Sequence, residues 1–114
     1  FSNKPHEAAV KVVETVFGRG FFDRVQGQTP EIPKKPDPAG IFKIMELFQV
    51  TPEECLYFGD TNTDMAAGHN AGIFTVGVSW GFRPRSELEA CHADRIIDRP
   101  GEILEVYRER NHEA

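Results

Sequence analysis

The chain has 114 residues, which is enough for one small domain with a core of its own. Its net charge of −5, from 18 acidic and 13 basic side chains, argues against a general nucleic-acid-binding protein, because such proteins usually present a basic face. No apolar run approaches the ~18 residues of a membrane span and no secretory signal is visible, so we expect no membrane association and a reduced, cytoplasmic setting.

Helices are expected to alternate with short strands along the chain. The clearest helix has apolar side chains at i, i+3, i+4 and i+7, and the strands are short apolar runs rich in β-branched or aromatic residues. In chain order we expect a helix over 6–17, a candidate short strand over 24–26, a proline-rich loop over 27–38, a helix over 38–49, a capped turn at 51–54, a strand over 55–59, a helix over 62–71, a strand over 73–78, a loop over 79–84, a helix over 84–91, a strand over 95–97 and a helix over about 100–108, with residues 109–114 frayed.

This order of elements predicts the fold class. Strands that alternate with helices indicate βαβ units and a mostly parallel sheet, so we expect an α/β, doubly wound, Rossmann-like sheet in a three-layer αβα arrangement. In the last helix, Ile103, Leu104 and Tyr107 are expected to face inward. We see one domain, with no linker and no internal repeat.

Residues 56–64, with the sequence Leu-Tyr-Phe-Gly-Asp-Thr-Asn-Thr-Asp, point most directly to chemistry. A buried parallel strand would end at Gly59 and deliver Asp60 to the carboxyl edge of the sheet, and Asp64 would lie in the first turn of the next helix. Two hard oxygen ligands beside a helix N-terminus suit Mg²⁺ and a phosphate. The alternative is that the two acids only cap and solvate the helix start.

Two further candidates, Ser2 and Lys35, lie in segments that would also reach this edge. A hydroxyl and backbone amides can hold phosphate oxygens, a lysine can neutralise charge on a transferring group, and carboxylates can hold Mg²⁺. The alternatives are that Ser2 with Asn3 provides helix-capping chemistry before Pro5, and that Lys35 forms a solvated pair with Lys34.

Taken together, these segments resemble the haloacid dehalogenase (HAD) superfamily of phosphatases, of the phosphoglycolate-phosphatase-like type. Phe-Ser-Asn-Lys-Pro at residues 1–5 resembles that family's second motif, and Lys-Pro-Asp-Pro at 35–38 resembles the third. Gly-Asp-Thr-Asn-Thr-Asp at 59–64 resembles the fourth, the GDxxxD motif, and residues 70–73 and 77–82 are similar to the segments that follow it. The ordered set covers almost the whole chain and is far more specific than any one motif.

The resemblance implies a Mg²⁺-dependent, two-step hydrolysis of a small phosphomonoester through an aspartyl-phosphate. It implies that Ser2 and Lys35 are catalytic, that Ser2, Asn3 and Lys35 bind the phosphate, and that Asp60 ligates the metal while Asp64 supports the metal site. A small phosphorylated metabolite is the implied partner. The cap that largely sets the substrate in this family has no counterpart here, so phosphoglycolate is a guess by likeness. The sequence specifies no oligomeric state.

The chain also departs from the family. The first motif, an Asp-x-Asp on the central strand that supplies the nucleophile, occurs nowhere in the sequence. In the family's strand order that strand would lie between the strand ending at Ser2 and the strand ending at Asp60, so its removal leaves two sheet edges without a neighbour. We therefore expect residues 1–114 to be the C-terminal portion of one HAD-like core domain from a longer chain. The isolated piece is expected neither to hydrolyse phosphate esters nor to fold cooperatively.

Two other functions stay open at this point. A dehalogenase or phosphonatase on the same fold is disfavoured, since a metal-independent dehalogenase would not need the carboxylate pair. A non-catalytic, degenerate HAD module that binds a phosphate ligand or a protein partner is the alternative from a different class. The residues encoded upstream decide between them, because an Asp-x-Asp-x-Thr or Asp-x-Asp-x-Val segment there supports the enzyme.

Overall fold

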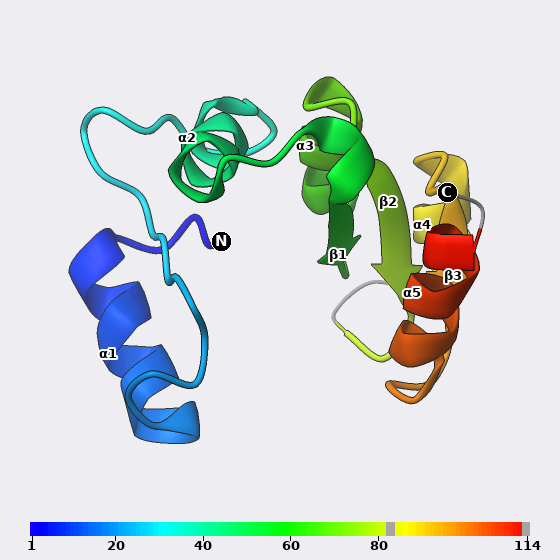
Figure 1. The fold of residues 1–114 in the computed structure, drawn as a ribbon, viewed down its shortest axis with the longest axis horizontal. Coiled ribbons are helices and arrows are strands. Elements are labelled where there is room, and N and C mark those ends of the chain that lie inside the picture. Colours follow the sequence, from blue (N-terminus) through cyan, green and yellow to red (C-terminus); the bar gives the residue numbers. More distant parts are fainter. Residues whose placement is uncertain (82–83, 113–114) are drawn as a thin grey trace.

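A parallel three-stranded sheet organises the C-terminal half of the chain in the computed structural model, which describes residues 1–81 and 84–112. The strands β1 (Leu56–Gly59), β2 (Phe74–Val78) and β3 (Arg95–Ile97) pair in the order β1–β2–β3 (Figure 1). The helices are α1 (His6–Phe17), α2 (Ala39–Phe48), α3 (Asn62–Asn70), α4 (Arg85–Ala90) and α5 (Glu102–His112), with a 3₁₀ turn at Pro52–Glu54. The α/β prediction with a parallel sheet is confirmed.

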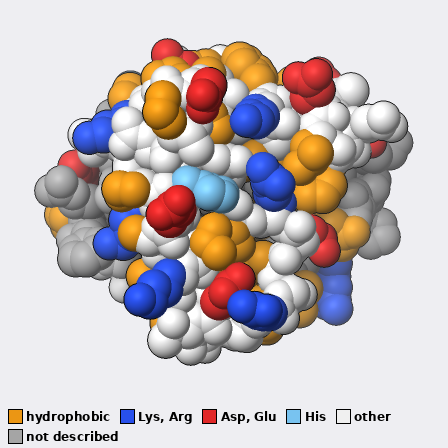
Figure 2. All heavy atoms as spheres, turned by 90° about the vertical axis from the view of Figure 1, so that its left-hand side faces the viewer, with side chains coloured by type: hydrophobic (Ala, Val, Ile, Leu, Met, Phe, Trp, Pro, Cys, Tyr) orange, Lys and Arg blue, Asp and Glu red, His pale blue; other side chains and the backbone are white. Residues whose placement is uncertain are grey.

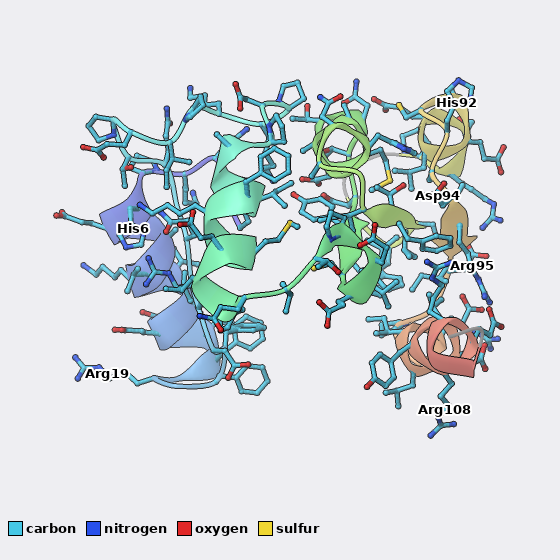
Figure 3. The ribbon with its side chains drawn as sticks, turned by 45° about the horizontal axis from the view of Figure 1, so that its top comes forward. His6, Arg19, His92, Asp94, Arg95 and Arg108 are labelled. Carbon is cyan, nitrogen blue, oxygen red and sulfur yellow. The ribbon has the colours of Figure 1, made fainter. Side chains whose placement is uncertain are left out.

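Helices cover both faces of this sheet, as the layered arrangement requires. Side chains alternate along β2, so Thr75 meets α3 and Gly77 meets Leu88 of α4 on one face. On the opposite face Val76 packs with Val106 of α5. Figure 3 shows α3 and α4 on one side of the strands and α5 on the other. None of the described helices is long and apolar enough to cross a bilayer.

The N-terminal segment pairs with a distant part of the chain. The Ser2 N–H donates to the carbonyl of Gln26 at 2.9 Å, and the Gln28 N–H donates to the carbonyl of Lys4 at 2.7 Å. Only an isolated parallel bridge forms here, between Pro5 and Gln28. The candidate strand over 24–26 is therefore wrong in its position, because the pairing falls at residues 26–28.

Helix α2 joins this N-terminal part to the sheet. Ile41 and Met45 of α2 form one buried cluster with Ala67, Ala71 and Ile73. The ring of Phe1 packs against α2 at Gly40, where a Cβ would lie 2.3 Å from the ring. Figures 1 and 3 both show α2 between α1 and α3. The N-terminal segment thus approaches the sheet through α2.

The last helix differs from its prediction in length and in orientation. It continues to His112 instead of ending near residue 108. Leu104 and Tyr107 are exposed by 59% and 55%, so the expectation that both face inward was wrong, whereas Ile103 does pack on the core. The most buried side chain of α5 is Val106, at 1% exposure.

Several apolar side chains of the N-terminal part stay exposed. The rings of Phe17, Phe21 and Phe22 contact one another with centroids 4.9–5.2 Å apart, yet all three are largely exposed. Val12 and Val16 of α1, which precede these rings in the sequence, are exposed as well. Figure 2, which views the molecule from this end, shows acidic, basic and apolar side chains interspersed, with no large patch of one sign.

Candidate functional site at the carboxyl edge of the sheet

A cavity of about 470 Å³ opens at the carboxyl end of β1. Phe1, Ser2 and Lys35 line one side, and β1 with the loops that follow β1 and β2 lines the other. Of the five residues predicted to bind phosphate or metal, Ser2, Lys35, Asp60 and Asp64 line this cavity, whereas Asn3 does not. The fold therefore brings together side chains that are up to 62 positions apart in the sequence.

Asp64 is fixed at the start of α3 by reciprocal capping. The Asp64 N–H donates to the hydroxyl of Thr61 at 3.1 Å, and that hydroxyl donates back to Asp64 Oδ2 at 2.9 Å. The backbone N–H of Asp60 also donates to Asp64 Oδ2, at 3.2 Å. The helix cap is thus Thr61, and Asp60 lines the cavity.

Two glycines make room for the carboxylates. A Cβ on Gly59 would lie 2.2 Å from the Cβ of Asp64, and a Cβ on Gly81 would lie 2.2 Å from the Cβ of Asp60. Contacts this short cannot be relieved by rotating a side-chain tip, so any other residue would displace the acid or the loop. Gly59 belongs to the recognised motif, whereas the packing of Gly81 on Asp60 was not foreseen and has no local signal in the sequence.

Lys35 pairs directly with Asp64. Its Nζ donates to Asp64 Oδ1 at 2.6 Å and lies 3.4 Å from the carbonyl oxygen of Phe1. Both side chains of the pair are only 11% exposed, whereas Lys34 is exposed. Lys35 is therefore not one member of a solvated lysine pair.

The surroundings of Asp64 set the charge state of the site. Burial acts to raise the pKa of Asp64, but the hydrogen bond and charge of Lys35, with the hydrogen bonds from Thr61 and Asp60, outweigh it and hold that pKa below its usual value. Burial, together with the negative charge of Asp64, raises the pKa of the Tyr57 hydroxyl well above its ordinary value. At neutral pH the cavity thus holds an ionised carboxylate beside a neutral phenol.

Ser2 and Asn3 differ in how they relate to the cavity. The Ser2 hydroxyl accepts the Lys4 N–H at 3.1 Å, which leaves its proton available for donation. The Oδ1 of Asn3 accepts the backbone N–H of Lys35 at 2.8 Å. Ser2 lines the cavity, whereas the side chain of Asn3 ties the N-terminal segment to the lysine loop.

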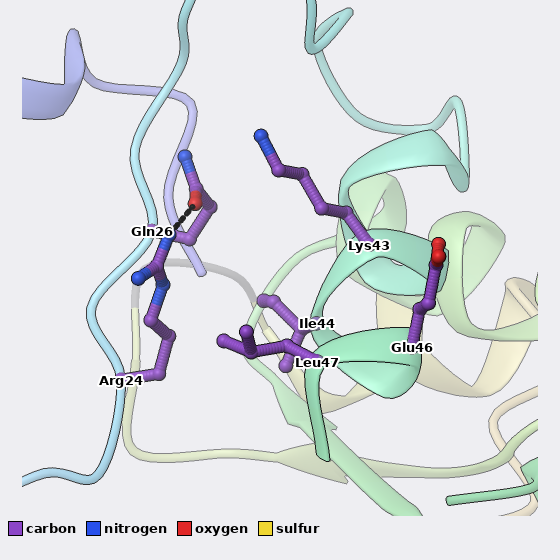
Figure 4. A pocket seen from close by; sticks show the side chains of 6 residues that line it. All are labelled: Arg24, Gln26, Lys43, Ile44, Glu46 and Leu47. Carbon is purple, nitrogen blue, oxygen red and sulfur yellow. Dashed lines mark hydrogen bonds between the residues drawn. The ribbon is translucent and has the colours of Figure 1, made fainter. Parts of the chain in front are cut away.

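A second cavity, of about 400 Å³, lies between residues 24–26 and α2. Arg24 and Gln26 face Lys43, Ile44 and Leu47 across it, and Arg24 donates a hydrogen bond to Gln26 (Figure 4). None of the five predicted site residues lines it, and its wall also carries the acidic Glu46. We therefore locate the candidate active site in the first cavity.

Comparison with known proteins decides the family. Residues 1–78 match the family model described as haloacid dehalogenase-like hydrolase. This chain belongs to the haloacid dehalogenase-like hydrolase family. The resemblance inferred from the motifs is confirmed.

Relatives and solved structures of this HAD family agree with the match. The chain is 31% identical to the phosphoglycolate phosphatase of Aquifex aeolicus, over 92% of this chain and 48% of that protein. It is 40% identical to pyrophosphatase PpaX of Bacillus mycoides, over 63% of this chain and 34% of the relative. The structure of a haloacid dehalogenase-like hydrolase from Streptococcus pneumoniae superposes with a TM-score of 0.84 at 28% identity, over 92% of this chain and 49% of that one. The chain thus spans about half or less of the length of each.

The donor set at the cavity suits the metal that a HAD hydrolase implies. Asp60 and Asp64 offer carboxylate oxygens, and Mg²⁺ is commonly held by one or two carboxylates with water completing its shell. The two oxygens of Asp64 accept three hydrogen bonds, from Lys35, from Thr61 and from the backbone of Asp60. No group of three or more His, Cys, Asp or Glu side chains suited to a metal occurs within residues 1–81 and 84–112. The described residues therefore fit one side of a Mg²⁺ site.

Proposed function

We propose that residues 1–114 are the C-terminal portion of the core domain of a Mg²⁺-dependent HAD phosphatase. Its substrate would be a small phosphomonoester of the cytoplasm, of the phosphoglycolate type, hydrolysed through an aspartyl-phosphate on a residue outside this chain. The observation that carries the proposal is the convergence of Ser2, Lys35, Asp60 and Asp64 on one cavity at the carboxyl edge of the sheet. The names of the relatives from Aquifex and Bacillus support phosphate-ester or pyrophosphate hydrolysis.

Each of the predicted site residues has a specific role in this proposal. The Ser2 hydroxyl donates a hydrogen bond to an oxygen of the transferring phosphoryl group, and the backbone N–H of Asn3 donates a second one. Lys35 places its ammonium against the negative charge that the group carries through the transition state. Asp60 is the direct metal ligand, while Asp64 holds Lys35 and supports Asp60. Bound Mg²⁺ would add positive charge that polarises the phosphoryl oxygen.

The sheet itself supports the view that a further strand belongs here. Within the described residues, β1 pairs only with β2, and the backbone of the Phe1–Lys4 segment pairs with other backbone only at residues 26–28. The cavity lies between these two free edges. A parallel strand in this position would satisfy both edges and would deliver its last residues beside Asp60 and Ser2. We propose that this strand carries the nucleophilic aspartate.

The test uses the protein expressed from the whole reading frame that contains residues 1–114, here called the full-frame protein. It is assayed with phosphoglycolate, a panel of other phosphomonoesters and pyrophosphate, with Mg²⁺ and with EDTA. We expect hydrolysis of at least one of these substrates that requires Mg²⁺ and falls by about 10²-fold or more in Asp60→Asn. Asp23→Asn, a change of an exposed carboxylate, is the control that should keep full activity.

The rival function is a non-catalytic, degenerate HAD module that binds a phosphate ligand or a protein partner. A reading frame without an upstream Asp-x-Asp, together with no turnover on any of the compounds, would replace the phosphatase by this module. Turnover that is insensitive to both EDTA and Asp60→Asn would contradict the metal role.

A further inference from the structure

Asn70 makes a contact that links α3 to the lysine loop. Its side-chain Nδ2 donates to the backbone carbonyl of Pro36 at 3.0 Å, across 34 positions of sequence. Asn70 is the last residue of α3, and the same helix carries Asp64 in its first turn. Because Asp64 Oδ1 accepts Lys35 Nζ at 2.6 Å, the Lys35–Pro36 dipeptide is held by α3 at two separate points.

These two points lie far apart on the helix. Asn70 lies six positions after Asp64, which corresponds to ~9 Å along the axis at the usual rise of an α-helix. The backbone of the lysine loop therefore lies beside the C-terminal end of α3, while the ammonium group lies beside its N-terminal end. Asn70 itself does not line the cavity, so it has no direct access to a substrate there.

The other side of the same dipeptide is held as well. The backbone N–H of Lys35 donates to Asn3 Oδ1 at 2.8 Å. The side chain of Asn3 thus fixes the backbone N–H of Lys35, and the side chain of Asn70 fixes the carbonyl of the next residue, Pro36. A lysine side chain has many rotamers, so anchoring its backbone on both sides reduces the number of positions from which Nζ can reach Asp64.

We propose that Asn70 is a positioning residue for Lys35, which it holds in register with Asp64 through the carbonyl of Pro36. The importance of this for turnover rests on the proposed catalytic function of Lys35, but the positioning itself does not. Asn70 would couple the helix that bears the metal-site carboxylate to the loop that bears the phosphate-binding cation. Loss of the Asn70 contact would then let the loop shift and move Lys35 Nζ away from Asp64, although neither of these two side chains is changed.

The test reads the position of Lys35 without relying on activity. The full-frame protein is treated briefly with an amine-acylating reagent, and modification of Lys35 is measured by mass spectrometry relative to its exposed neighbour Lys34. Asn70→Ala and Asn70→Asp both remove the donor, and alanine does not weaken α3, because it is the better helix former. We expect both to raise the Lys35 to Lys34 ratio about fivefold, as the loss of one hydrogen bond allows.

A matched control separates positioning from general loosening. Val106→Ala removes buried volume on the opposite face of the sheet, so it should lower the thermal midpoint without changing the Lys35 to Lys34 ratio. An unchanged ratio in both Asn70 variants would overturn the proposal. It would also be overturned if Val106→Ala raised the ratio as much as they do.

Activity measurements then distinguish this inference from the proposed function. If Lys35 is catalytic, Asn70→Ala lowers kcat in the parent protein and has little further effect in a Lys35→Ala background. A raised labelling ratio with unchanged turnover would support the positioning and overturn the catalytic function of Lys35. Equal losses in both backgrounds would show that Asn70 acts independently of Lys35, and so would contradict the proposal.

Discussion

One largely buried ion pair, Lys35 with Asp64, dominates the site at the scale of single residues. Asp64 is 11% exposed and keeps its charge because Lys35, Thr61 and the Asp60 N–H all donate to it. Breaking a buried ion pair by removing one partner is costly, since the other charge is left without compensation. The pair therefore serves stability as well as the proposed chemistry.

This pairing predicts a pH-dependent stability. Because the folded-state pKa of Asp64 is lowered, its contribution is fully present above the unfolded-state pKa of about 3.9 and is lost as pH falls through the lower folded value. Asp64→Asn should cost about 3 kcal/mol at pH 7 and progressively less below pH 4. Urea unfolding of the full-frame protein from pH 7 to pH 3 measures this, with Asp23→Asn as the control. A gap between wild type and Asp64→Asn that stays constant down to pH 3 would contradict it.

At the scale of elements, apolar periodicity located the helices and strands but not every buried face. In α5 the apolar positions Ile103, Leu104, Val106 and Tyr107 follow one another too closely for the spacing to choose a face. Packing against the sheet decides which face is buried, because Ile103 and Val106 contact the apolar cluster of β2 and β3. The extra length of α5 also depends on distant partners, because Glu109 pairs with Arg95, and Arg110 lies 4.3 Å from the ring of Phe74.

The corrected face of α5 can be tested with two matched truncations. Val106→Ala should lower the free energy of unfolding by about 2 kcal/mol, because it removes buried methyl groups from a packed cluster. Leu104→Ala removes more atoms from an exposed position and should change it by no more than about 0.5 kcal/mol. Both are measured by urea unfolding at pH 7. A larger loss in Leu104→Ala would mean that the intact protein covers this side of α5.

At the scale of the whole molecule, the motifs predicted which residues share a cavity because the carboxyl ends of parallel strands meet at one edge. Pairing that spans long stretches of sequence was less accessible. The contact of Phe1–Lys4 with residues 26–28 and the anchoring of the lysine loop by Asn3 and Asn70 have no local pattern in the sequence. These contacts nevertheless hold the N-terminal segment and the lysine loop in place beside the cavity.

The free edges also predict how the isolated chain behaves. A polypeptide of residues 1–114 leaves the edge of β1 without a partner within the described residues, and leaves exposed the apolar side chains Val16, Phe21 and Leu47. We therefore expect a broad thermal transition, binding of a hydrophobic dye and no phosphatase activity, because uncovered apolar surface and open edges weaken cooperativity. The full-frame protein should unfold in a sharper transition with a larger urea m-value, since it exposes more surface on unfolding. A sharp transition and Mg²⁺-dependent turnover in residues 1–114 alone would contradict both the missing strand and the external nucleophile.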